Sequence, residues 1–126
     1  MTTFTEGRHT AEFILSEGNG QISRSNVTLL GGFTGAGTIQ AGTVLGKITS
    51  GGKYAISPAT GGDGSQTGFA ILIDNVDVTD GDVVAAVISR DAEVNGGCLV
   101  FDSTVDDGTK EAAKATQLAL VGIIVR

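Results

Sequence analysis

Residues 43–73 read TVLGKITSGGKYAISPATGGDGSQTGFAILI, and this stretch decides the fold class of the chain. Two short runs rich in aliphatic and β-branched residues, 43–48 and 53–56, flank the turn sequence TSGG at 49–52, a pattern typical of a β-hairpin. A long glycine-rich loop then leads into the apolar run 69–73, which predicts a buried strand. The stretch therefore predicts three consecutive strands joined by turns.

The same pattern of short apolar runs continues toward the end of the chain. Residues 83–89 and 97–101 predict two more strands, and residues 121–126 predict a buried terminal strand. Glycine accounts for 20 of 126 residues, which is 20/126 or about 16%, against roughly 7% in average proteins. We therefore expect a mainly β fold of many short elements, a small barrel or sandwich, and no helical bundle.

One helix is predicted, over residues 109–119 (TKEAAKATQLA), because this run is rich in strong helix formers. Two aspartates directly before it put negative charge at the positive end of the helix dipole. We expect Lys110 and Lys114 to point to water, since they lie one turn apart. The face that packs on the sheet is expected to consist of alanines, namely Ala112, Ala115 and Ala119.

The first twelve residues are polar and contain no run able to nucleate a core. The pair Asn19-Gly20 is a hairpin signal, but the runs beside it alternate poorly, so extended chain is the better expectation there. We divide the chain into an extended N-terminal arm (1–30), a glycine-rich connection (31–42) and a β-rich domain (43–126).

Charge and hydropathy exclude several classes of partner. Eight Lys and Arg residues against 14 Asp and Glu give a net charge of −6, which repels nucleic-acid backbones. The apolar runs are far shorter than the roughly 20 residues that span a bilayer, so we expect no membrane contact. The N-terminal sequence lacks the apolar segment of a signal peptide, and we expect synthesis in a cytoplasm. The single cysteine, Cys98, excludes an intrachain disulfide and is expected to be a buried structural thiol.

The residues of the chain offer little for catalysis. His9 is the only histidine and lies in the polar arm, away from any predicted nucleophile. The glycine-containing segments 35–40 and 41–48 lack residues that dinucleotide-binding and phosphate-binding loops require. We therefore predict that the protein is not an enzyme, has no catalytic residues and binds no cofactor.

The acidic segment 74–82 raises the question of a metal site. An EF-hand loop starting at Asp74 would need oxygen ligands at its third and fifth positions, which here hold Val76 and Val78. The segment 61–66 matches one calcium-binding β-roll repeat only in part and occurs as a single copy. We predict no metal site and regard these carboxylates as solvated turn residues. A calcium site or an enzyme acting through this segment stays open as a minor alternative, with these side chains as its ligands: Asp74, Asp77, Asp80 and Asp82.

The order of these elements resembles that of the head decoration proteins of tailed bacteriophages, the phage lambda type. The resemblance rests on the hairpin 43–56, the loop with its Gly-Asp-Gly sequence, the strand 69–73, and the helix and terminal strand from 109 to 126. The segment 11–30 looks like the N-terminal block of longer members of that family. The resemblance implies a β-tulip-type domain with one short helix in the C-terminal half and an extended N-terminal arm.

The resemblance also implies a function. It implies a homotrimer on the outer surface of the virion, bound at local three-fold positions of the expanded capsid, where it cements the major capsid protein. We expect the arm to bind by adding a strand to the capsid protein. Alternation along a strand would put the side chains of Phe13 and Leu15 on one face and that of Ile14 on the other. The predicted capsid-contact residues of the arm are Phe4, Phe13, Ile14, Leu15 and Ile22. Two alternatives remain open, another virion β-domain of the tail or baseplate, and a generic oligomeric binding module.

Overall fold

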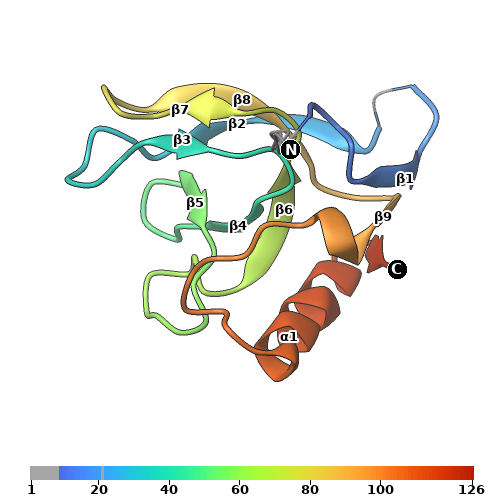
Figure 1. Cartoon of the computed structure of the whole chain (residues 1–126). Coiled ribbons are helices and arrows are strands. Elements are labelled where there is room, and N and C mark those ends of the chain that lie inside the picture. The colour runs from blue at the N-terminus through green and yellow to red at the C-terminus, as the bar shows by residue number, and fades with distance from the viewer. Residues whose placement is uncertain (1–8, 21) are drawn as a thin grey trace, which may run out of the picture.

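A computed structural model describes residues 9–20 and 22–126 (Figure 1). The described elements, in chain order, are β1 (Ile14–Glu17), β2 (Arg24–Leu29), β3 (Thr38–Ile39), β4 (Val44–Lys47), β5 (Tyr54–Ile56), β6 (Gly68–Leu72), β7 (Val76–Asp77), β8 (Val83–Ile88), β9 (Ala92–Val94), the 3-10 helix η1 (Gly96–Cys98), the helix α1 (Gly108–Ala119) and β10 (Ile123–Val125). The predicted fold class, mainly β with one helix, is confirmed.

Five strands form a closed barrel in the order β2-β5-β4-β6-β8. The predicted hairpin is present, because β4 pairs antiparallel with β5 with Leu45 opposite Ile56 and Lys47 opposite Tyr54. Strands β4, β6 and β8 are antiparallel neighbours, as are β8 and β2. The barrel closes through one parallel pairing, Leu29 of β2 with Tyr54 of β5.

A second, three-stranded sheet lies beside the barrel in the order β1-β9-β10 (Figure 1). Strand β9 pairs antiparallel with β1 and parallel with β10, so this sheet joins the start of the described chain to its end. Strands β3 and β7 form a separate two-stranded sheet. The helix α1 packs against β6 and β10.

Two apolar clusters make up the core. One lies between the barrel, the β1-β9-β10 sheet and α1, and its largest fully buried members are Phe13, Ile71, Ile88, Leu118 and Ile123. The other fills the opposite part of the barrel and contains Leu29, Leu45, Tyr54, Leu72 and Val87. Aliphatic side chains supply most of both clusters, since Phe13 and Tyr54 are their only buried aromatic members.

The structure places much of the predicted arm inside the fold. Strand β2 pairs with β8 along its whole length, from Arg24 opposite Ile88 to Leu29 opposite Val83. Its outward side chains are polar, which is why the segment reads from sequence as a solvated extension. The division predicted at residue 30 therefore does not coincide with a boundary of the fold. Residues 1–8, which contain the rest of the predicted arm, lie outside the described residues.

The predicted glycine-rich connection 31–42 is an ordered part of the structure. Ile39 and Ala41 are buried, and Ile39 pairs with Val76 across the small β3-β7 sheet. Gly31 packs so closely that a Cβ atom there would lie 2.1 Å from the carbonyl oxygen of Gly81. Glycine at this position serves a close approach of two backbones as well as chain flexibility.

Two predictions near the end of the chain are wrong. Residues 97–101 do not form a strand, because Asn95 caps the short helix η1 and Val100 makes only an isolated bridge with Thr43. The strand of this region is β9, which precedes the turn. The buried face of α1 consists of Lys114 and Leu118, whereas Ala112 and Ala119 are exposed. Lys114 therefore does not point to water.

Candidate interaction surface

The acidic segment 74–82 has a structural role in the described chain. The carboxylate of Asp74 accepts hydrogen bonds from the hydroxyl of Thr10 and the amide of Asn75. The hydroxyl and amide of Thr79 both donate to Asp77, and these bonds lower the pKa of Asp77. The described residues hold no group of three or more His, Cys, Asp or Glu side chains arranged to bind a metal ion. They also include no helix long and apolar enough to cross a membrane.

The β1-β9-β10 sheet has two open edges among the described strands, since β1 and β10 each pair with β9 alone. Ser16, Glu93 and Ile124 lie side by side in its register. A shallow groove of 330 Å³ runs along this sheet and is lined in part by these three side chains. Leu15 is 54% exposed and lies on β1 at the rim of the sheet. Backbone groups at such an edge are available to pair with another strand.

The structure separates the predicted capsid-contact residues into two groups. Phe13 is fully buried in the core, and its carbonyl accepts a hydrogen bond from the amide of Asn95. It is therefore a core residue, and the prediction that it contacts the capsid is corrected. Ile14 is partly buried against the same cluster, whereas Leu15 and Ile22 are more than half exposed. Phe4 lies outside the described residues.

The expected strand alternation fails at this point. Phe13 and Leu15 were predicted to share a face, yet one is buried and the other is exposed. The pairing of β1 with β9 shifts between Ile14 and Ser16, which marks a β-bulge or a similar irregularity. An extra residue in one strand of a pair reverses the alternation beyond it.

A compact turn connects β1 to β2 and holds the side chain of Ile22 outward. The guanidinium of Arg24 donates two hydrogen bonds to the carboxylate of Glu17, over 3.0 and 2.8 Å. These bonds lower the pKa of Glu17. The hydroxyl of Ser23 donates to the carbonyl of Asp91 over 2.7 Å, and Arg90 donates to the carbonyl of Ile22 over 2.6 Å. The turn is thereby tied to the segment that precedes β9, and Ile22 remains 55% exposed.

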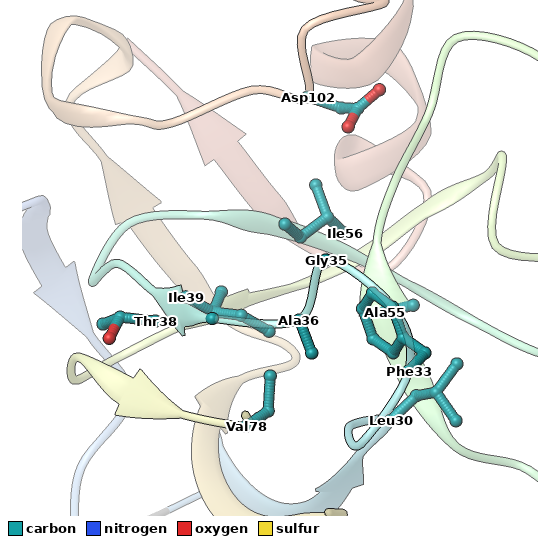
Figure 2. A pocket seen from close by; sticks show the side chains of 11 residues that line it. Leu30, Phe33, Gly35, Ala36, Thr38, Ile39, Ala55, Ile56, Val78 and Asp102 are labelled. Carbon is teal, nitrogen blue, oxygen red and sulfur yellow. The ribbon is translucent and has the colours of Figure 1, made fainter. Parts of the chain in front are cut away.

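A pocket of 340 Å³ opens at the other end of the barrel, beside β3 and β5 (Figure 2). Figure 2 shows mostly apolar side chains around one space, with Asp102 at its edge. Phe33 is 51% exposed and Ile56 is 37% exposed at this pocket. Sequence reasoning missed the site, because the glycine-rich segment that forms its wall reads as a linker. The apolar members of the lining are Leu30, Phe33, Ala36, Ile39, Ala55, Ile56 and Val78.

Comparison with known proteins agrees with this picture of a binding protein without a catalytic centre. The family model described as bacteriophage lambda head decoration protein D matches residues 3–123, nearly the whole chain. A search of curated proteins finds no match. The chain therefore belongs to the family of the bacteriophage lambda head decoration protein D, and its role is the decoration of a phage head.

Proposed function

We propose that the protein is a homotrimeric cement protein that binds the exterior of the expanded capsid at local three-fold sites and stabilises the shell. The observation that carries this proposal is the family match over residues 3–123. The proposed partners are the major capsid protein and two further copies of this chain. A protein in this role needs binding surfaces and no catalytic residues.

The open edge of β1 supports binding by strand addition. A strand of the capsid protein that pairs with this edge would gain backbone hydrogen bonds, while side chains fill the groove along Ser16 and Ile124. Leu15 and Ile22 add exposed apolar area at the same end of the molecule. The Glu17–Arg24 contact holds the turn in place before binding, so little conformational freedom is lost there on binding.

Copy number and charge also fit this role. Three copies bound to one site engage it multivalently, so that modest contacts in each copy add up to slow release. The net charge of −6 on each chain suits a surface that faces solvent and disfavours the DNA-filled interior. We propose synthesis in the host bacterial cytoplasm and a final location on the outside of the virion.

The test compares variants of the full chain for binding to expanded capsids. The first variant lacks residues 1–8, and the second carries Leu15→Ala with Ile22→Ala. A deletion must end before Ala11, because its amide donates to the carbonyl of Ile73 and the core begins at Phe13. We expect both variants to remain folded trimers and to bind expanded capsids at least tenfold more weakly, a loss of about 1.4 kcal/mol.

Val84→Ala is the matched control, since it shortens an exposed side chain on the barrel strand β8. It is expected to bind capsids as the unaltered protein does. Undiminished binding by the first two variants would refute the proposed contact surface. Sedimentation as a hexamer, without affinity for capsids, would favour a tail or baseplate role.

A further inference from the structure

The apolar pocket in Figure 2, here called the Phe33 pocket, is well suited to one aromatic side chain. Its volume of 340 Å³ exceeds the roughly 150 Å³ of an apolar cavity known to hold benzene. Phe33 and Ile56 remain substantially exposed at its mouth, and the wall opposite them is made by Ala36, Ile39 and Val78. An aromatic side chain that entered this space would cover part of that apolar surface.

The chain itself supplies such a side chain within reach. The described chain starts next to β7, because the hydroxyl of Thr10 donates to Asp74 over 2.7 Å and the amide of Ala11 donates to Ile73 over 2.8 Å. From Asp74, the path along β7 to Val78 at the pocket measures at most about 13 Å in extended chain. The segment from Thr10 back to Phe4 spans up to about 20 Å. It is therefore long enough to bring Phe4 to the pocket of the same chain.

Charge along this path favours the same approach. Strand β7 and the turn after it carry exposed carboxylates at Asp77 and Asp80, and Asp102 lies at the edge of the pocket. Arg8 is two residues before Thr10 in the sequence and is the single cation among residues 1–8. A cation there meets an acidic surface in a chain whose net charge is −6.

We propose that Phe4 docks into the Phe33 pocket of its own chain in the free protein. The docked segment is held by one aromatic ring and by weak surface attraction, so a competing surface displaces it readily. The contact would keep an apolar residue of the arm from self-association until another surface binds the arm. The proposal goes beyond the decoration role, and it holds whether or not residues 1–8 bind a capsid.

A single fluorophore tests this contact, because the sequence contains no tryptophan. We expect Phe4→Trp in the full chain to show blue-shifted emission and slower quenching by acrylamide than Thr2→Trp, which places the fluorophore elsewhere in the same segment. Adding Gly37→Leu is expected to abolish both effects, since a larger side chain there projects from the pocket lining. A Cβ at Gly37 meets no atom within 4 Å, so the fold should tolerate the change.

Gly62→Leu is the matched control, because a Cβ there also meets nothing within 4 Å and the residue lies outside the pocket lining. It should leave the emission of the Phe4→Trp protein unchanged. Circular dichroism checks that each variant is folded, and Ile56→Gln offers a second way to weaken the pocket at an exposed position. Emission of Phe4→Trp equal to that of Thr2→Trp would overturn the proposal. Emission unaffected by both pocket variants would also overturn it.

A mixing experiment distinguishes docking within a chain from docking between copies. Chains that carry both Phe4→Trp and Gly37→Leu are refolded together with an excess of unaltered protein. Docking within one chain leaves the emission unshifted, because the only tryptophan belongs to a chain whose own pocket is filled. Recovery of the blue shift in the mixture would show that a neighbouring copy accepts the side chain and would overturn the proposal.

Discussion

The ammonium group of Lys114 lies 2.7 Å from the hydroxyl oxygen of Ser57, on the buried face of helix α1. It also donates to the carbonyls of Pro58 and Gln66, and only 2% of the residue is exposed. All three of its N–H donors thus have an acceptor in the loop that joins β5 to β6. Burial lowers the pKa of Lys114, and these three oxygens compensate for part of the lost hydration. One side chain of the helix therefore fixes a long glycine-rich loop.

Replacing Lys114 by methionine is expected to reduce the free energy of unfolding by about 2 kcal/mol, because three acceptors of the loop lose their donor. Urea denaturation measures the change. Lys110→Met is the control on the same helix, where a partly exposed lysine pairs with Asp106, and its effect should stay below about 1 kcal/mol. Equal stability of Lys114→Met and the unaltered protein would contradict a structural role for the buried amine.

Phe13→Ala is expected to cost about 3–5 kcal/mol of stability, because it empties a fully buried aromatic site in the core. Leu15→Ala, two residues further on, should change stability by no more than about 0.5 kcal/mol, since that side chain is half exposed. Thermal unfolding of the two variants separates core from surface. Similar unfolding midpoints would mean that Phe13 is not a core residue.

Gly31→Ala is expected to destabilise the protein by about 1–3 kcal/mol, because the new methyl group would collide with the backbone of Gly81 and Val78. Gly37→Ala belongs to the same glycine-rich segment and meets no neighbouring atom, so it serves as the control. Chemical denaturation compares the two variants. A fully stable Gly31→Ala protein would show that the two backbones do not approach closely.

The protein is expected to lose stability in acid through Asp77 and Asp82. Hydrogen bonds from Thr79 lower the pKa of Asp77, and those from Lys53 and the amide of Gly31 lower the pKa of Asp82. Both pKa values are thus lower in the folded than in the unfolded chain. The resulting stability is present above the ordinary value of 3.8 and is lost as the pH falls through the folded values.

The double variant Asp77→Asn with Asp82→Asn tests this expectation. Its melting temperature should fall less between pH 7 and pH 3 than that of the unaltered protein, which scanning calorimetry measures. An equal fall in both proteins would assign the acid sensitivity to other carboxylates. Glu17 is one such group, since its pKa is also lowered by Arg24.

Local signals were sufficient for several elements of the fold. The β4-β5 hairpin could be predicted because the two runs and the turn between them are contiguous in the sequence. The helix could be predicted because helix formers follow an aspartate, and Asp107 indeed accepts a hydrogen bond from the amide of Lys110. Both elements depend on residues near in sequence.

Long-range packing decided what sequence patterns could not. Strand β2 is polar outward and gains its place in the barrel only through β8, which lies more than fifty residues later in the sequence. The contrast between Phe13 and Leu15 depends on an irregular pairing with β9 that no nearby residue signals. The Phe33 pocket likewise forms only where β3, β5 and the residue after β7 come together.

The amino-acid sequence by itself determined a mainly β protein with one capped helix, an acidic surface and no residues arranged for catalysis, because composition and short-range periodicity carry that information. Only the tertiary structure decided which apolar side chains are buried and which are available to a partner. Burial depends on strands and loops that meet from distant parts of the chain, as Lys114 shows: its sequence neighbours predict a solvated lysine, and the loop folded over it makes it a buried one.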